Sequence, residues 1–290
     1  MSVVNTNVSA SVAQAALTRN ERALGAAMEK LSTGKRINSA ADNAAGLTIS
    51  AQLTSQIRGL GAEVSNANDA ISMVNTADGA LDEITTMLQR MRELAVQAGT
   101  GTTAATDRTY LQSEFTALRT EIDRIADNTQ WNGRNILDGS AGASTGKSTV
   151  AFGIGQDGTA AQTLSTSFGN FNNTTGALSG LASKIITGTS STTASAITVA
   201  AAAIVEIDVV IGDVSSQRAT FGAVSNRLTH AVDNLTNVKT NAEAARSRIL
   251  DTDYAAATSE LARTQIIQQA GTAMLAQANQ LPQTVLALLQ

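Results

Sequence analysis

The chain has 290 residues, a net charge of −4, 3% aromatic residues and no cysteine. This composition excludes disulfides and cysteine-ligated metals, and it favours neither a nucleic-acid-binding surface nor a base-stacking platform. The N-terminus has neither a basic segment nor a long apolar one, so we expect no cleaved secretory signal, and export would need another route. The C-terminal stretch, residues 264–290, contains seven glutamines and is too polar to span a membrane.

Both ends of the chain lack charged side chains. Residues 1–18 and 264–290 contain none of the 20 Lys and Arg or the 24 Asp and Glu residues. Apolar side chains recur near the two ends at helical spacing: Leu17, Leu24, Met28 and Leu31, and Ile267, Met274, Leu281, Val285 and Leu288. Such stripes need a cover, so we predict that the terminal helices pair with one another. We also expect them to order fully only when they pack on other copies.

The N-terminal third begins with a predicted helix over residues 8–33. Lys30 lies in its last turn and Gly34 is suited to the left-handed position that ends a helix. A weak capping box at Ser39 and Asp42 predicts that a second helix starts there.

Two long helices of nearly equal length follow from regular apolar seams. Residues 53–98 carry an apolar side chain every three or four positions, with consecutive steps of three before Asp78, which predicts local overwinding. Residues 203–249 show the same spacing. At ~1.5 Å per residue each helix would be roughly 70 Å long, typical of a rod rather than a globe.

The segments between the long helices are shorter. A seam over residues 111–125 predicts a helix that ends near Asn128, followed by a turn at residues 131–133. Residues 139–200 are rich in Gly, Ser, Thr, Ala and Asn, and alternation around Phe152 predicts a β-hairpin near 149–168. The remainder of that region is expected to be loop.

Together these elements predict a mainly α fold: a long antiparallel coiled-coil or helical-bundle rod with a small β-hairpin region. The predicted segments are an N-terminal inner-core helix, two outer-core parts that flank a short variable region, and a C-terminal inner-core helix. The N-terminal inner-core helix covers residues 1–40 and the C-terminal one covers 250–290. The outer-core parts are residues 41–139 and 200–249, and the variable region between them is 140–199.

Several long runs resemble bacterial flagellin. They include Leu31-Ser-Thr-Gly-Lys-Arg-Ile-Asn-Ser-Ala40, Leu88-Gln-Arg-Met-Arg-Glu-Leu-Ala-Val-Gln97, Ser247-Arg-Ile, Gln268-Gln-Ala-Gly-Thr272 and Leu275-Ala-Gln-Ala-Asn279. The resemblance covers roughly residues 1–139 and 200–290. The short middle region implies that the large outer domains of many flagellins are missing and that the filament is thin and smooth.

The resemblance implies a structural subunit that self-assembles into the helical flagellar filament for swimming. It further implies type III export, an extracellular location, and partners that include an export chaperone, the filament cap and hook-associated junction proteins. From the net charge, the polar C-terminal stretch and the lack of a reactive constellation we also expect no nucleic-acid binding, no membrane insertion, no enzymatic activity and no cofactor. The alternatives are a hook–filament junction protein and a secreted adhesin or immune-recognised ligand.

A patch on the first long helix matches a subunit-contact surface of the family, which in some flagellins is read by the flagellin-sensing Toll-like receptor. Its residues are Gln89, Arg90, Leu94, Gln97 and, on the next helix, Glu114. The alternative is that Leu94 merely widens the core stripe and that the charges are solvated.

The sequence offers no catalytic or metal-binding constellation. His230 is the single histidine and has no ligand motif beside it, so we interpret it as structural or surface-exposed. Asp251 and Asp253 are interpreted as capping residues at a break between helices rather than as an acid–base pair. The Ser- and Thr-rich middle is interpreted as solvated linker, with O-glycosylation, known in some flagellins, as the alternative.

Overall fold

A computed structural model describes residues 7–139, 147–155, 163–172, 176–182, 186–187 and 193–287. The chain forms two compact units, each described by itself. Unit 1 comprises Met1–Arg58 and Lys239–Gln290, and unit 2 comprises Gly59–Val238. The fold is mainly α, as predicted, with two small antiparallel hairpins.

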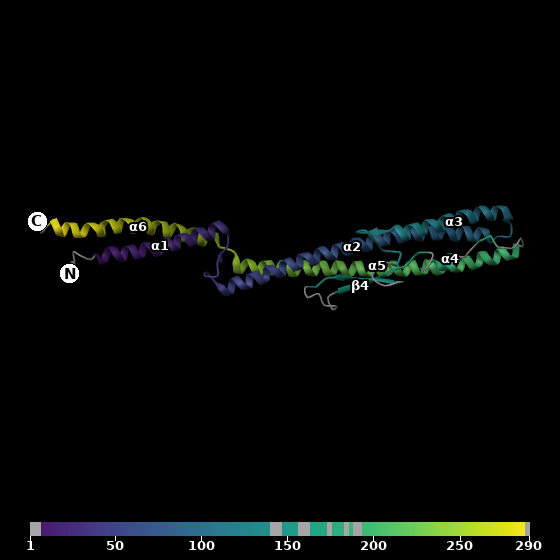
Figure 1. The fold of residues 1–290 in the computed structure, drawn as a ribbon, viewed down its shortest axis with the longest axis horizontal. Helices are drawn as coiled ribbons and strands as arrows, with labels where there is room; N and C mark the ends of the chain where they lie inside the picture. Colours follow the sequence, from purple (N-terminus) through teal and green to yellow (C-terminus); the bar gives the residue numbers. More distant parts are fainter. Residues whose placement is uncertain are drawn as a thin grey trace. The chain divides into compact units, whose positions relative to one another are not determined.

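Unit 1 is built on a pair of antiparallel helices, α1 (Val8–Thr33) and α6 (Tyr254–Ala287), which lie side by side (Figure 1). Helix α1 begins where the side chain of Asn7 accepts a hydrogen bond from the amide of Ala10. It ends at Gly34, whose φ of 68° is left-handed, as the sequence predicts. The predicted pairing of the terminal helices is therefore present in the single chain.

The two segments that follow α1 and precede α6 are joined to one another. Lys35 and Asp251 form an antiparallel β-bridge, and the amide of Thr252 donates to the carbonyl of Gly34 at 3.0 Å. The guanidinium of Arg36 donates to the carbonyls of Arg248 and Ile249 at 3.2 and 2.7 Å. Because these carbonyls belong to the last turn of α5 (Thr193–Leu250), Arg36 caps that helix from the opposite segment of the chain.

The start of α2 (Ala44–Ala98) differs from the sequence-based expectation of a cap at Ser39 and Asp42. The cap is Asn43, whose side-chain oxygen accepts from the amide of Gly46 at 2.8 Å. The carboxylate of Asp42 instead accepts from the amides of Asn38 and Ser39. It therefore closes a tight turn before the helix rather than opening the helix itself.

Unit 2 is a bundle in which α2, α3 (Ala105–Asn128) and α5 (Thr193–Leu250) run side by side (Figure 1). Arg92 pairs with Asp208 at 2.7 Å, and Arg218 pairs with both Asp78 and Asp82 at 2.9 and 2.7 Å. Residue numbers increase along α2 while those of their partners in α5 decrease, so the two helices are antiparallel, as predicted. Helix α5 begins about ten residues before its predicted seam because the alanine-rich segment before Ala203 is also helical.

The core of unit 2 follows the predicted seams. Fully buried side chains include Leu81, Ile84, Leu88 and Met91 of α2, Phe115 and Ile122 of α3, and Ile207, Val210, Val214 and Leu228 of α5. Several of the layers are closed by alanine, including Ala67, Ala77 and Ala203, which are 0% exposed. Small residues at these positions let the helices approach closely, although each alanine layer buries little apolar area.

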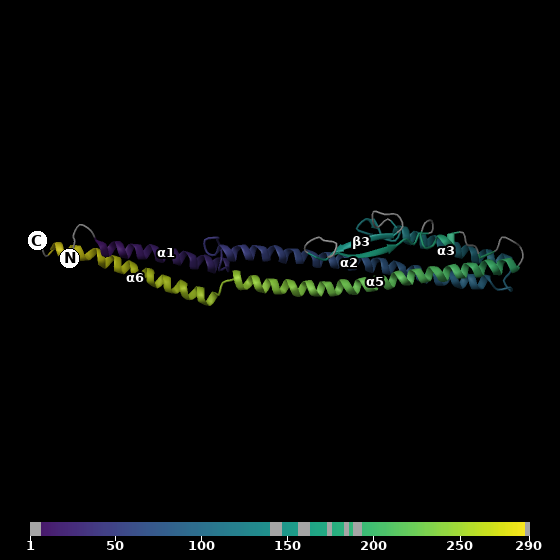
Figure 2. The ribbon, with the colours of Figure 1, turned by 90° about the horizontal axis from the view of Figure 1, so that it is seen from below.

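Two hairpins complete unit 2. Strands β1 (Gln130–Trp131) and β2 (Arg134–Asn135) are joined by Asn132 and Gly133, both with positive φ, as a two-residue hairpin requires. Strands β3 (Lys147–Gly153) and β4 (Thr163–Gly169) form the predicted hairpin (Figure 2). It packs on α5, where the rings of Phe168 and Phe221 lie 5.1 Å apart. A short helix, α4 (Ser179–Ala182), follows. The division of the chain into two inner-core helices, two outer-core parts and a variable region remains a prediction.

Candidate interaction surfaces

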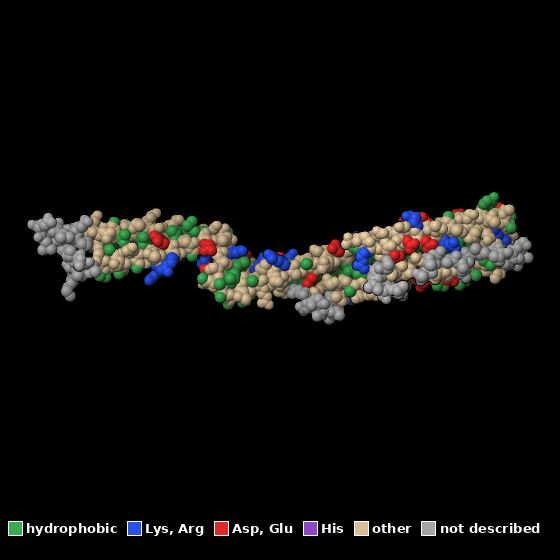
Figure 3. Space-filling view, in the orientation of Figure 1, with side chains coloured by type: hydrophobic (Ala, Val, Ile, Leu, Met, Phe, Trp, Pro, Cys, Tyr) green, Lys and Arg blue, Asp and Glu red, His purple; other side chains and the backbone are tan. Residues whose placement is uncertain are grey.

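The paired terminal helices leave large apolar side chains in solvent. Val8, Val12, Met28, Ile266 and Met274 are between 57% and 66% exposed, and Ile267 is 42% exposed. Hydrophobic side chains are visible on the surface of the α1–α6 pair in Figure 3. Scattered apolar residues are ordinary on a protein surface, but a set concentrated on one helix pair marks an interaction site.

Part of this surface is hollowed into a groove of about 510 Å³ along both helices. Its walls are Val8, Ser9, Val12, Ala13, Ala16 and Leu17 of α1 and Ile267, Gly271 and Met274 of α6. None of these described wall residues is charged. Within the groove Leu17 lies over Gly271, where an added β-carbon would come within 2.6 Å of the leucine Cδ1. Only glycine admits this approach without a shift of the leucine.

Two polar contacts fix the register of α1 against α6. The side-chain amide of Asn20 donates to the carbonyl of Thr264 at 2.8 Å, and that of Asn7 donates to the carbonyl of Ala278 at 2.7 Å. Asn20 and Thr264 are buried. A buried asparagine specifies register because a slipped pairing leaves its amide without a partner.

The predicted stripe residues of the terminal helices therefore divide into two groups. Leu17, Leu24 and Leu31 are half-buried, whereas Met28, Ile267 and Met274 are exposed. Leu281 and Val285 lie in α6, but their side chains fall outside the described residues, as does Leu288 altogether. The helical period alone could not separate the inward positions from the outward ones.

The predicted patch on α2 and α3 is only partly accessible. Gln89, Arg90, Gln97 and Glu114 are exposed. Arg90 forms ion pairs with Glu93 at 3.0 Å and Glu114 at 2.9 Å, and these partners raise its pKa, Glu114 most. The guanidinium is thus already engaged by α3.

The sequence-based prediction that Leu94 belongs to the subunit-contact patch does not agree with its position in the structure. Its side chain is 0% exposed and belongs to the core of unit 2. The reason is that α2 is covered on two sides, by α5 at Arg92 and by α3 at Arg90, so its buried stripe is wider than one seam. The alternative interpretation, that Leu94 widens the core, is the one the structure supports.

The break between α5 and α6 is capped by Asp253, one of the two predicted residues, whereas Asp251 forms the β-bridge with Lys35. One carboxylate oxygen of Asp253 accepts from the amides of Ala255 and Ala256 at 2.9 and 3.2 Å. Sequence reasoning missed the contributions of Asn20 and Arg36. Arg36 lies in the predicted turn after α1, but nothing local indicates that its partners lie more than two hundred positions away.

The single histidine, His230, is exposed on α5. Within the described part of the chain, no group of three or more acidic, histidine or cysteine side chains is arranged to hold a metal ion. No described helix is long and apolar enough to cross a bilayer.

Comparisons with known proteins agree with the fold. The profile described as "Bacterial flagellin N-terminal helical region" matches residues 4–142, and "Bacterial flagellin C-terminal helical region" matches residues 204–289. The chain is 41% identical to "Flagellin" of Bacillus subtilis (strain 168) and 36% identical to "Flagellin A" of Vibrio cholerae serotype O1. Each alignment covers 99% of both chains. Among solved structures, a putative flagellar hook-associated protein from Vibrio parahaemolyticus aligns with a TM-score of 0.60 over 72% of this chain and 100% of its own, at 13% identity, and shares the fold.

Proposed function

The chain belongs to the bacterial flagellin family, the subunits of the flagellar filament, and from this premise we propose that it polymerises through the exposed apolar surface of α1 and α6. The carrying observation is the concentration of exposed apolar side chains on these helices beside a groove whose described walls are uncharged. Burial of such surface contributes roughly 25 cal/mol per Å², which makes it the strongest available driving force for association.

The remaining parts of the proposal rest on the family resemblance. The chain leaves the cell through the flagellar type III apparatus and acts outside it, assisted by an export chaperone, a filament cap and junction proteins. The long helices of unit 2 supply the outer wall of the filament. Only residues 143–203 lie between the two family matches, which leaves no room for large outer domains. The filament is therefore thin and smooth.

Point variants test the apolar surface with a close control. Val12 of α1 and Val205 of α5 are both 64% exposed valines, but only Val12 lines the groove. Val12→Ser should raise the critical concentration for filament growth, measured by sedimentation and electron microscopy, whereas Val205→Ser should leave it near wild type. A chain lacking residues 1–35 and 264–290 should remain monomeric. Equal effects of the two valine variants would argue against the groove.

A second function concerns the flagellin-sensing Toll-like receptor, for which the exposed part of the α2–α3 patch is the candidate contact. The supporting observation is that Arg90 and Glu114 present a paired charge in solvent, flanked by Gln89 and Gln97. Receptor-reporter potency should fall for Arg90→Ala and Gln97→Ala. Arg92→Ala is the control, since Arg92 is similarly exposed and pairs with Asp208 instead. Potency unchanged by the first two variants would remove this function.

A further inference from the structure

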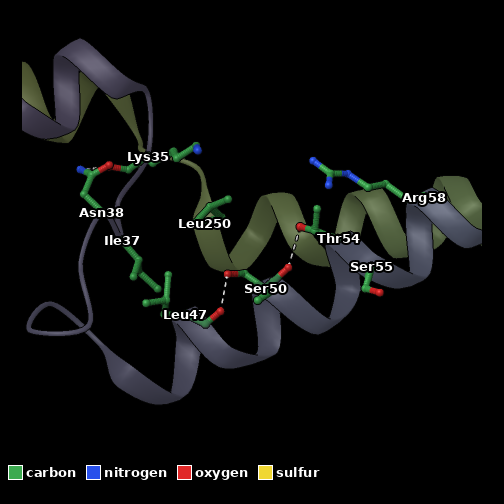
Figure 4. Close-up of a pocket in the computed structure, with 10 residues that line it drawn as sticks. Lys35, Ile37, Asn38, Leu47, Ser50, Thr54, Ser55, Arg58 and Leu250 are labelled. Atoms are coloured by element: carbon green, nitrogen blue, oxygen red, sulfur yellow. Dashed lines mark hydrogen bonds between the residues drawn. The ribbon is translucent and has the colours of Figure 1, made fainter.

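Unit 1 contains a second pocket that differs in chemistry from the apolar groove. Its volume is about 450 Å³, and it lies where the segment after α1 meets the first turns of α2 and the end of α5 (Figure 4). Ile37, Leu47 and Leu250 supply apolar walls. Ser50 and Thr54 also line it, but their hydroxyls donate to backbone carbonyls of their own helix at 2.8 and 2.7 Å.

The charged residues that line this pocket are both positive. They are Lys35 and Arg58, both are exposed, and Figure 4 shows their cationic groups on the same side of the pocket. Among the residues that the structure describes, neither side chain forms an ion pair or a hydrogen bond. No described carboxylate lines the pocket, and nearby Asp42 is occupied by the amides of Asn38 and Ser39.

The charge of the whole chain is divided unequally between the two units. Unit 1 carries ten Lys and Arg residues against seven Asp and Glu, a net charge of +3, whereas unit 2 carries ten against seventeen, a net charge of −7. In the described part of unit 2, six exposed carboxylates form no ion pair: Asp69, Glu83, Asp107, Asp127, Asp213 and Asp233. A second copy of this chain therefore supplies the negative surface that the pocket lacks.

We propose that the pocket rimmed by Lys35 and Arg58 is a contact between copies, in which it receives a carboxylate from unit 2 of a second copy. The inference rests on the proposed self-assembly and adds a polar, directional contact to the apolar one. Apolar surfaces associate without strong preference for register, whereas a cationic pocket and a carboxylate specify one axial position. The contact is heterologous because different surfaces of the two copies meet, as open helical polymers require.

Zero-length cross-linking tests the contact directly. Filaments grown from an equal mixture of ¹⁵N-labelled and unlabelled chain are treated with a carbodiimide, which joins a lysine amine to a carboxylate in direct contact. Mass spectrometry should find Lys35 joined to a carboxylate of residues 59–238 in mixed-isotope pairs, at least tenfold more abundantly than in monomer. Lys35→Arg keeps the charge but cannot react, so this cross-link should vanish while filaments persist. Lys35 joined only within one copy, or unreacted in intact filaments, would overturn the proposal.

Assembly energetics supply an independent readout. At about 0.02 M salt, Arg58→Gln should raise the critical concentration about three- to fivefold, the effect of one exposed ion pair, and the difference should shrink at about 0.5 M salt because of screening. Arg58→Lys retains the charge and should assemble like wild type, as should Arg19→Gln, which removes a charge of unit 1 outside the pocket.

The outcomes separate this inference from self-assembly itself. If the wild-type chain forms no filaments, the proposed function fails. If wild-type filaments form and Arg58→Gln matches them at every salt concentration, only the pocket contact fails. Binding of inorganic phosphate to monomer at Lys35 and Arg58, seen by NMR shifts and without the cross-link in filaments, would assign the pocket to free anions instead and overturn the inference.

Discussion

The side-chain amide of Asn20 donates a hydrogen bond of 2.8 Å to the main-chain carbonyl of Thr264, and both residues are buried where α1 packs on α6. The two residues are 244 positions apart in the sequence. This bond ties the two uncharged ends of the chain together in a defined register.

Asn20→Ala should therefore loosen the terminal helix pair. Loss of one buried hydrogen bond should lower the free energy that holds α1 on α6 by about 1 kcal/mol. Hydrogen exchange should consequently become about fivefold faster in both helices, with little change in unit 2. Gln14→Ala, at an exposed position of the same helix, is the control. Faster exchange confined to α1, with α6 unaffected, would contradict a role for the bond in pairing.

Gly271 gives a second prediction about the same helix pair. Alanine would add roughly 1 kcal/mol of helix propensity, but its β-carbon would lie 2.6 Å from Cδ1 of Leu17. We expect Gly271→Ala to yield less than that gain in thermal stability, and Gly271→Ala with Leu17→Ala to relieve the crowding. A β-carbon added at Gly212 of α5 would meet no described atom within 4 Å, so Gly212→Ala should show the full gain. Equal stabilisation by the two glycine substitutions would refute the close packing of Leu17.

Leu94 and Arg90 should respond differently to truncation. Leu94→Ala removes a fully buried side chain from the core of unit 2 and should cost about 2–5 kcal/mol in the free energy of unfolding. Arg90→Ala removes an exposed charge and should barely change chemical denaturation curves. A loss of receptor signalling in Leu94→Ala would therefore reflect destabilisation of unit 2 rather than a lost receptor contact, so the stability of this variant must be measured in parallel. A Leu94→Ala chain as stable as wild type would show that its core position is wrong.

The helices were predictable because their signals are local and repeated. The helix over residues 8–33 agrees with the structure at both ends, since an apolar period runs up to Gly34 and only glycine favours the left-handed position there. The hairpin around Phe152 was predictable from alternation. The alanine-rich seams of α2 and α5 match the buried layers because their spacing is typical of packed antiparallel helices.

The contacts between distant segments were not predictable from the sequence. Arg36 caps α5 from 212 residues away, and no local signal distinguishes it from Lys35, which lines a pocket with its charge unpaired in the described chain. Likewise, periodicity places Leu94 on a face with Arg90 and Gln97, but it cannot report that α3 covers part of that face. The candidate site thus depends on which helix packs where, and that information is tertiary.

Asp42 carries the pH-dependent prediction. The amides of Ser39, chiefly, and Asn38 donate to its carboxylate and lower its pKa below the ordinary value of 3.8. A carboxyl with a lowered folded pKa stabilises the fold above its unfolded pKa, and this contribution is lost as the pH falls through the folded pKa. The turn over residues 38–42 should therefore persist at pH 4 and loosen only below 3.8.

The measurement is the NMR chemical shift of the Ser39 amide proton, because this amide donates a hydrogen bond to the Asp42 carboxylate, with 2.9 Å between the nitrogen and Oδ2. Its titration midpoint in the wild-type chain should lie below 3.8. Asp42→Asn keeps an acceptor oxygen but cannot titrate, so the inflection should disappear while the turn remains. Asp42→Ala removes the acceptor, and the amide should exchange faster at every pH. A wild-type midpoint above 3.8, or an inflection that persists in Asp42→Asn, would assign the titration to another group.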